Sequence, residues 1–377
     1  AAPPRDEPGW PCLVSVVCPT CEARQIFHPI LYQSFAGQDW EPKELVVVDT
    51  GAEPSSFFLD RAKDDPRVTY RFFQEAPEAP GPASGDGIGI GGRWSLGLKR
   101  NLCAHLSRGA VIAHMDDDDL YAPGYLSHMV AGMLRGVGLR VDPAPAAAAP
   151  RDDDVVKVQT CLTSAMVAKL SEWHVLDLHD MCFGLLDVQR DPLVPKNAAR
   201  AWLYGWGFSY VYTRAAWQAV GFPDVDFSED RRFIEAAAMM GASVVVVRLP
   251  PGSRGLQRGP AGLCAHTAHA GSCSGGEYAE CSWTDARGTL CWGDVRAGVP
   301  MPMPCEFRDF VPLLQRLKAS DAYQRMEARA AQDERWRGRV GLRRKTALLG
   351  AALRPGLEVA REVLNALFYA PVGDEME

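Results

Sequence analysis

Hydrophobic residues in the first part of the chain form short runs, separated by a segment of helical periodicity. Residues 13–18 (LVSVVC) and 44–49 (ELVVVD) are rich in β-branched side chains, and each run ends in turn-forming residues. Residues 26–35, between the two runs, carry apolar side chains at helical spacing. A strand, a helix and a second strand in this order predict a parallel βαβ unit with strands buried on both faces.

The same alternation continues along the chain. Further strands are expected at residues 68–73, 110–115, 208–213 and 242–249, and helices at residues 96–106 and 232–240. The pattern predicts an α/β fold with a Rossmann-like, mostly parallel central sheet flanked by helices. In such folds ligands bind beyond the carboxyl ends of the strands.

Three segments interrupt the pattern. Residues 76–92 and 136–154 are rich in Pro, Gly and Ala and are interpreted as surface insertions. The first contains a GxGxxG match, but no strand directly precedes it, so it does not predict dinucleotide binding. Residues 250–304 are rich in Gly and Cys and have little periodicity, so we expect long loops there.

The last part of the chain has helical composition over residues 310–336 and 345–370. Its middle carries a cluster of basic residues followed by leucines. Such a basic amphipathic segment is typical of a helix that flanks a domain or forms an interaction surface. Peripheral membrane contact through this helix is the alternative reading. We therefore expect a C-terminal helical extension over residues 305–377.

Composition limits the class of protein. The chain has 377 residues, a net charge of -7 and an isoelectric point near 5.7, which argue against a nucleic-acid partner. No apolar run of membrane-spanning length, no signal peptide and no N-glycosylation sequon is present, which favours a cytoplasmic location. The first residue is Ala, as expected for a fragment of a longer protein. The eleven cysteines are interpreted as free structural thiols.

Four consecutive carboxylates, Asp116 to Asp119, follow the strand predicted at residues 110–115. Adjacent carboxylates repel one another and raise each other's pKa unless a cation lies among them. A solvated acidic turn would not require a buried strand in front of it. Carboxylates at the end of a central strand are suited to hold a divalent ion and, through it, a phosphate group. The sequence therefore predicts a metal and diphosphate site.

Seven motifs then resemble family-2 glycosyltransferases in order and spacing, over residues 11–272. They are the first strand with Thr20, the run ending in Asp49, the segment SLGLKRN, the acidic motif 116–121, the segment WGFSYVYTRAAW, the segment GFP, and SED followed by Phe233. The resemblance implies a GT-A fold and transfer of a sugar from a nucleotide donor. It does not extend over the last hundred or so residues.

The resemblance also implies roles for individual residues. Thr20 and Arg24 match positions that meet the nucleotide, and Asp49 matches the acid that binds uracil or ribose. Arg100 matches a nucleotide-contacting arginine. Asp116 and Asp118 match the DxD motif, the first directed at the ribose and the second at Mn²⁺ or Mg²⁺. The remaining matches are Asp230 as general base with Glu229 beside it, Trp206 and Gly207 under the acceptor, and His266 as a metal ligand.

Two motifs depart from the family pattern. The first loop reads PTCEAR where PTYNR is usual, so the Tyr and Asn are lost and Arg24 is shifted by one position. The late motif, often RHxxN, reads Ala265-His266-Thr267-Ala268-His269. His266 keeps its place while the flanking residues differ, so the sequence leaves it open between a ligand and a structural histidine.

Other candidates carry less information. Trp94, Trp173, Trp202 and Trp217 have faces that stack on sugars, but only Trp206 lies in a motif. His174, His179 and Asp180 lie in a segment of helical or mixed composition and are residue types that can bind a second metal. Isolated residues of this kind are more often hydrogen-bonded core residues or surface residues, and no second metal is predicted.

The sequence as a whole predicts an inverting, metal-dependent glycosyltransferase that moves a sugar, with a UDP-sugar expected, to a hydroxyl of a carbohydrate, lipid or protein. One carboxylate base without a second carboxylate nucleophile implies direct displacement. The expected GT-A domain spans residues 11–304, with a nucleotide-binding half at 11–123, an acceptor half at 155–272 and loops at 250–304. A nucleotidyltransferase on a related fold and a non-catalytic carbohydrate-binding relative remain as alternatives.

Overall fold

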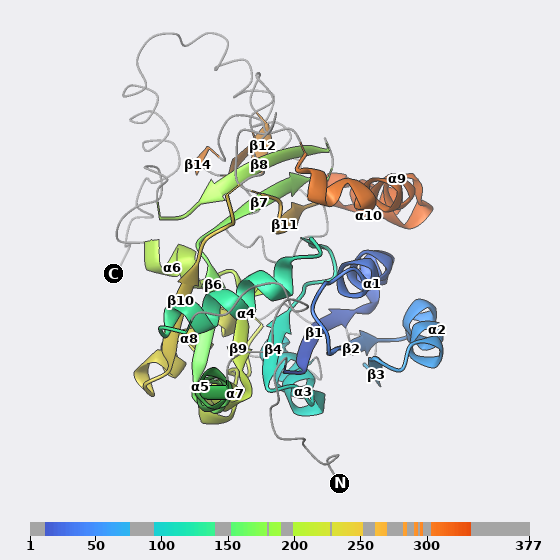
Figure 1. Ribbon diagram of the computed structural model, residues 1–377. Coiled ribbons are helices and arrows are strands. Elements are labelled where there is room, and N and C mark those ends of the chain that lie inside the picture. The colour runs from blue at the N-terminus through green and yellow to red at the C-terminus, as the bar shows by residue number, and fades with distance from the viewer. Residues whose placement is uncertain are drawn as a thin grey trace, which may run out of the picture.

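The computed structural model describes residues 12–75, 94–139, 152–178, 181–189, 199–226, 228–251, 261–269, 282–284, 290–292, 295–296 and 303–332. A central sheet of seven strands has the order β10-β6-β9-β4-β1-β2-β3 (Figure 1). Only β9 runs antiparallel to its neighbours β4 and β6. The strands are β1 (Val14–Cys21), β2 (Lys43–Gly51), β3 (Val68–Gln74), β4 (Val111–His114), β6 (Met166–Leu170), β9 (Val211–Thr213) and β10 (Ser243–Val247). The predicted α/β fold with a mostly parallel sheet is confirmed.

Helices cover this sheet, as the apolar patterns require. Every residue of β4 is buried, and β1 and β2 are buried over nearly their whole length, because helices pack on both faces. The helices are α1 (His28–Ala36), α2 (Ser56–Asp64), α3 (Leu96–Leu106), α4 (Tyr125–Gly136), α5 (Asp152–Thr163), α6 (Ala199–Tyr204), α7 (Arg214–Val220) and α8 (Glu229–Met239), with 3-10 turns η1 (Glu22–Phe27) and η2 (Gly207–Ser209).

A second sheet of four strands lies beyond one end of the first (Figure 1). Its order is β5-β11-β7-β8, formed by β5 (Leu120–Tyr121), β7 (Glu172–Asp177), β8 (Cys182–Asp187) and β11 (Cys264–Ala268). Strand β11 pairs with β5, which directly follows the four aspartates. Residues 264–268 are therefore brought to the acidic turn by sheet pairing rather than by proximity in sequence.

Several sequence expectations need correction. The segment 250–304 is not only loop, because it contains β11 and a small antiparallel sheet of β12 (Ser282–Thr284), β13 (Leu290–Trp292) and β14 (Val295–Arg296). The strand expected at residues 208–213 is shorter and is preceded by η2. His174 lies in strand β7 and not in a helical segment. The GxGxxG match and residues 179, 180 and 345–370 lie outside the described residues.

The start of the predicted C-terminal extension belongs to the hydrophobic core. The 3-10 turn η4 (Cys305–Phe310) and helix α9 (Val311–Ala319) are followed by α10 (Asp321–Gln332), which replaces the longer helix expected at residues 310–336. Phe307 and Leu314 are fully buried in one cluster with Phe27 of η1 and Leu176 of β7. The α9 region thus stabilises the second sheet, and the domain boundary at residues 304 and 305 stays a prediction.

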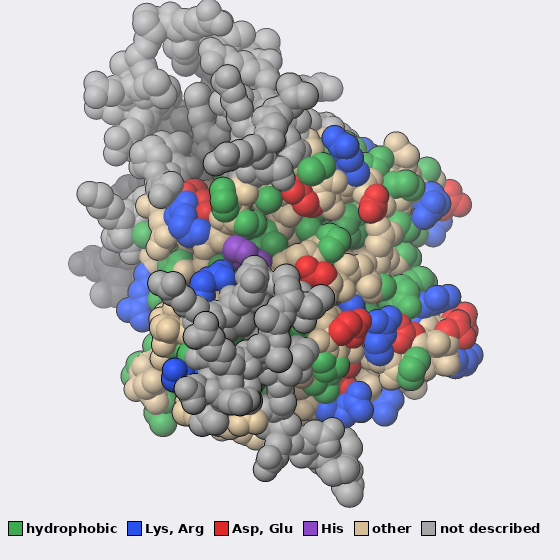
Figure 2. Space-filling view, in the orientation of Figure 1, with side chains coloured by type: hydrophobic (Ala, Val, Ile, Leu, Met, Phe, Trp, Pro, Cys, Tyr) green, Lys and Arg blue, Asp and Glu red, His purple; other side chains and the backbone are tan. Residues whose placement is uncertain are grey.

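Lys, Arg, Asp and Glu side chains are interspersed over the described part of the surface that Figure 2 shows, with hydrophobic side chains between them. Within the described residues, helices of membrane-spanning length and apolarity are absent.

His174 makes the stability of this fold dependent on pH. Its side chain is fully buried against Phe307, and neither ring nitrogen has a hydrogen-bond partner. Burial lowers the pKa of His174 to about 4, below the ordinary value of 6.5. Since the unfolded chain takes up this proton at higher pH than the folded chain, the contribution of neutral His174 is complete above pH 6.5. It is lost as the pH falls toward 4.

Between pH 8 and pH 5 the unfolding free energy of the wild type should fall by about 2 kcal/mol more than that of His174→Leu, because leucine takes up no proton. Urea unfolding at the two pH values measures this difference. The exposed His105 offers a matched control, since His105→Leu removes a histidine that folding does not bury. Equal acid losses in wild type and His174→Leu would contradict the assignment.

Candidate active site

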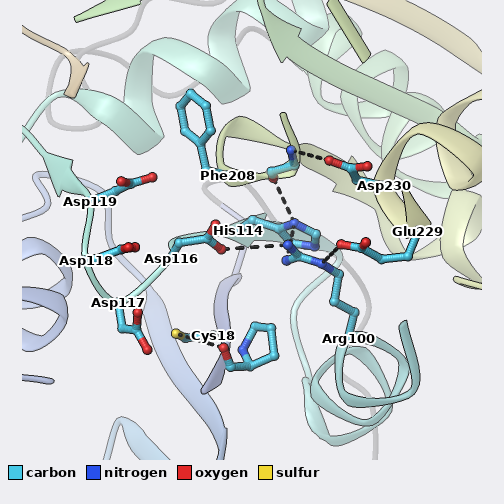
Figure 3. Close-up of polar contacts among 12 residues, drawn as sticks. Cys18, Arg100, His114, Asp116, Asp117, Asp118, Asp119, Phe208, Glu229 and Asp230 are labelled. Atoms are coloured by element: carbon cyan, nitrogen blue, oxygen red, sulfur yellow. Dashed lines mark hydrogen bonds and ion pairs between the residues drawn. The ribbon is translucent and has the colours of Figure 1, made fainter. Parts of the chain in front are cut away.

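The acidic turn lies at the carboxyl end of β4, a central strand of the seven-stranded sheet. The close-up shows its four carboxylates side by side, with that of Asp116 directed toward Arg100 (Figure 3). Asp117, Asp118 and Asp119 are buried, whereas the side chain of Asp116 is 26% exposed. The turn therefore presents one accessible carboxylate in front of three that are held by the protein.

Arg24 of η1 holds two of these carboxylates. Its Nε donates to Asp117 Oδ1 at 2.7 Å, and its Nη2 forms an ion pair with Asp118 Oδ2. Thr20, at the end of β1, donates from its hydroxyl to Asp117 Oδ2 at 2.5 Å. Burial raises the pKa of Asp117 to about 6 against the opposing charge of Arg24. The predicted first-loop residues Thr20 and Arg24 thus meet the acidic turn directly.

Two histidines of the late motif reach the same turn, but at different carboxylates. His266 Nδ1 lies 3.0 Å from Asp119 Oδ2, and its ring stacks on Phe208. His269 Nε2 lies 2.8 Å from Asp118 Oδ2. Burial lowers the pKa of His269, which favours the neutral imidazole. Burial would also lower the pKa of His266, but Asp119, Asp118 and Asp116 together raise it. Of the two histidines, His269 and not the predicted His266 contacts the carboxylate predicted to bind the metal.

Arg100 of α3 connects the acidic turn to the start of α8. Its Nε donates to Glu229 Oε1 at 2.9 Å, and its Nη2 lies 3.8 Å from Asp116 Oδ1 (Figure 3). Its Nη1 lies 3.0 Å from His114 Nδ1. Burial raises the pKa of Glu229 to about 7, with Asp230 adding to it and Arg100 opposing it. The buried Arg100 guanidinium therefore holds Asp116 of the acidic turn and Glu229 of α8 at a fixed separation.

Asp230 lies in the first turn of α8 with both carboxylate oxygens engaged by backbone amides. Oδ2 accepts from the Gly207 N–H at 2.7 Å (Figure 3). Oδ1 accepts from the Arg231 N–H at 2.6 Å. Each oxygen keeps a further lone pair. Burial raises the pKa of Asp230, and Arg100 is the largest opposing influence. The carboxylate is thus held in a fixed orientation and has an increased affinity for a proton.

Asp49 lies at the carboxyl end of β2, on the nucleotide side that the sequence predicts. Its Oδ2 accepts from the Tyr70 hydroxyl at 2.6 Å and from Gln25 Nε2 at 3.1 Å. Its Oδ1 is buried and has no hydrogen-bond partner. Burial raises the pKa of this carboxyl. An unpaired buried acceptor of this kind fits a ligand that brings an N–H or O–H group.

Trp206 is buried to a degree that limits a stacking role. Its side chain is 6% exposed and packs against Trp173, Trp202 and the edge of His266. The next residue, Gly207, bears the N–H that binds Asp230. A Cβ at Gly207 would lie 2.9 Å from Asp230 Cβ, so this close approach requires glycine. Their predicted place under the acceptor is not tested by these contacts.

The residues that the sequence reading missed are His269, His114, Lys99 and Lys169. His269 lies in the late motif, where it replaces the usual Asn, and the motif alone gives it no role. Lys99, next to Arg100, donates from Nζ to the Thr20 carbonyl at 3.1 Å and so fixes the first loop. His114 is the last residue of β4, and Lys169 lies within β6. In both places a polar residue interrupts an apolar run of the sequence, and that interruption was the available signal.

The donor set at Asp118 fits a divalent ion. A carboxylate oxygen and a neutral imidazole nitrogen face each other at hydrogen-bond distance, and Arg24 and His269 keep the pKa of Asp118 below its ordinary value although burial would raise it. Among the described side chains, no three His, Cys, Asp or Glu residues form a group that could hold a metal. Mg²⁺ and Mn²⁺ are commonly completed by phosphate oxygens and water, so two protein ligands suffice.

Comparison with solved structures gives matches of low similarity. TarS 1-349 from S. aureus matches at 15% identity and a TM-score of 0.37, over 68% of this chain and 60% of that one. The same protein in complex with UDP matches at 14% identity and a TM-score of 0.38, over 94% and 78%. The mannosyltransferase PcManGT from Pyrobaculum calidifontis, in complex with GDP-Man and Mn²⁺, matches at 17% identity and a TM-score of 0.36, over 97% and 84%. No protein-family model and no curated protein matches the chain.

Proposed function

We propose that the protein transfers a sugar from a nucleoside-diphosphate sugar to a hydroxyl acceptor, with inversion at the anomeric carbon. The observation that carries this proposal is the position of Arg100, between Asp116 of the acidic turn and Glu229 beside Asp230. It joins a site suited to a diphosphate and its cation to a site suited to a general base. Both halves agree with the roles that the family-2 resemblance assigns.

Asp230 is the best candidate for the base. Its orientation is fixed by two backbone amides, and burial raises its pKa toward the range where a carboxylate accepts a proton efficiently. Glu229 is engaged with Arg100 and is therefore assigned to positioning. With one carboxylate available to accept the proton of the acceptor hydroxyl, and none assigned as a nucleophile, direct displacement follows.

The diphosphate would be bound by positive charges at the acidic turn. Arg24 lies partly exposed at Asp117 and Asp118, and a guanidinium forms paired hydrogen bonds with phosphate. Asp118 and His269 would hold Mn²⁺ or Mg²⁺. When bound, the ion supplies Lewis-acid neutralisation of charge on the leaving diphosphate.

Asp49 is assigned to the nucleoside. Its unpaired Oδ1 is an acceptor, and the ring N–H of uracil is a donor that a carboxylate binds. Guanine also presents N–H donors at its edge, so this carboxylate fits both bases. We propose a UDP-sugar as donor, in agreement with the resemblance, and a carbohydrate, lipid or protein hydroxyl as acceptor.

A thermal-shift and hydrolysis screen over nucleotide sugars, with and without Mn²⁺, tests the function. We expect nucleoside diphosphates and their sugars to raise the melting temperature in the presence of Mn²⁺, because they bind only the folded protein. Slow release of the free sugar should accompany this stabilisation. Stabilisation by several nucleoside triphosphates, but by no diphosphate or nucleotide sugar, would contradict sugar transfer and favour a nucleotidyltransferase. Stabilisation by sugars alone would indicate a carbohydrate-binding protein.

A further inference from the structure

Lys169 is a lysine in the interior of the protein. It belongs to β6, and its side chain is 0% exposed. Lysine is rarely buried to this degree, because an ammonium loses its hydration when it leaves water. A charged residue at such a position is retained only where its surroundings stabilise it or where the charge has a use.

The surroundings of the ammonium are a hydroxyl and three aromatic rings. Nζ donates to Ser209 Oγ at 2.5 Å. It lies 4.7 Å from the centre of the Phe208 ring, 4.8 Å from that of Trp173 and 5.6 Å from that of Tyr210. Cation–π contacts of this kind stabilise a desolvated ammonium in part. They also tie Lys169 to the segment around η2.

The same segment binds Asp230. Gly207, the first residue of η2, donates its N–H to Asp230 Oδ2, while Phe208 and Ser209, the next two residues, contact Lys169. Three consecutive residues of η2 therefore link the Lys169 ammonium to the Asp230 carboxylate. The two charges also act on each other through space: burial lowers the pKa of Lys169 to about 7, and Asp230 is the largest influence that opposes this.

We propose that Lys169 is a positioning residue for Asp230, which holds Gly207 to Ser209 in the shape that binds the carboxylate and supplies a positive charge that favours its ionised form. The inference rests on the function proposed above, in which Asp230 is the base. Lys169 itself touches neither substrate nor reacting atoms in this role.

Other charges act on the pair, and an experiment must separate them from Lys169. Asp230 is influenced by Arg100 of α3 and by its neighbour Glu229, as well as by Lys169. Lys169 is influenced by Asp230, by Cys264 of β11 and by Asp116 and Asp119 of the acidic turn. The Lys169 variants that follow keep all of these groups except Lys169 itself.

The test is a pH titration of Asp230, monitored by NMR of protein labelled with ¹³C at the Asp carboxyl groups. The Asp230 signal is identified as the one that Asp230→Asn removes. In Lys169→Met the midpoint should rise by about half a unit or more, because the opposing positive charge is gone. Lys169→Gln separates the charge from the hydrogen bond to Ser209 and should give the same rise. Lys169→Arg keeps the charge and should restore a midpoint close to that of the wild type.

Lys43 provides the matched control. It is also buried, and its ammonium is held by the Gln38 carbonyl and Glu41, at a different place in the fold. Lys43→Met should leave the Asp230 midpoint unchanged. An unchanged midpoint in whichever neutral Lys169 variant folds, or an equal rise in Lys43→Met, would overturn the inference.

Kinetics add a reading that loss of structure alone would not produce. Once a donor is known, the acidic limb of kcat/KM for Lys169→Met should move to higher pH together with the NMR midpoint. The KM for the nucleotide sugar should stay near that of the wild type. If the wild type transfers no sugar, the proposed function fails, while the NMR titration still decides whether Lys169 acts on Asp230.

Discussion

Asp230→Asn should lower kcat for sugar transfer by about a thousandfold, because the amide cannot accept the proton of the acceptor hydroxyl. The amide oxygen can still accept from the Gly207 N–H, so the side chain keeps its hydrogen bond to the segment around η2. Affinity for the nucleoside diphosphate should remain close to that of the wild type. Steady-state rates and calorimetric nucleotide binding measure the two effects separately.

The control for this variant is Asp60→Asn on α2, where the carboxylate lies on the surface and pairs with Lys63. It changes the same functional group at an exposed site and should leave the transfer rate unchanged. Transfer by Asp230→Asn at the wild-type rate would rule out Asp230 as the base. Loss of nucleotide affinity together with the rate would instead indicate a role in holding the site together.

Asp118→Asn should weaken Mn²⁺-dependent nucleotide binding by about a hundredfold or more, because a neutral amide replaces the carboxylate assigned to the ion. The same change removes the negative partner of Arg24 Nη2 and of His269. Titration of nucleoside diphosphate with and without Mn²⁺ measures the effect. Asp117→Asn, in the same turn and also bound to Arg24, should retain the dependence on Mn²⁺. An equal loss of that dependence in both variants would contradict a ligand role specific to Asp118.

The two histidines of the late motif can be separated in the same assay. His269→Ala should weaken the Mn²⁺ effect, since His269 Nε2 faces Asp118. His266→Ala should leave it largely in place, because His266 contacts Asp119 and the Phe208 ring. The reverse result would restore the ligand that the sequence motif indicated.

The sequence predicted the first half of the fold well, because buried parallel strands appear in the sequence as continuous apolar runs. Helix α3 spans the residues that periodicity predicted, and β1, β2 and β3 lie within a few residues of their predicted bounds. The second sheet was missed because its strands are short and show neither a long apolar run nor a regular alternation, and because β11 pairs with β5 and β7 across long separations in sequence. The signal for β11 is five residues long and lies in a Gly-rich region.

The candidate site divides in the same way. Asp116 and Asp118 were found because they follow a strand, and a strand end is readable from the chain. Asp49 was found through the family resemblance. The order of the motifs placed Arg100 and Asp230 in the same site. Which carboxylate Arg24 binds, and which histidine reaches Asp118, depends on side-chain direction in η1 and β11 and was not readable.

The sequence by itself determined the α/β class, the acidic turn at the end of a central strand and the chemical types of the site residues. These follow from local hydrophobic periodicity and from the position of charges relative to strand ends. Only the tertiary structure decided that Lys169 lies behind the segment that binds Asp230, and that His269 rather than His266 faces Asp118. Such pairings join residues that are far apart in the chain, and strand register and burial select them, not local propensity.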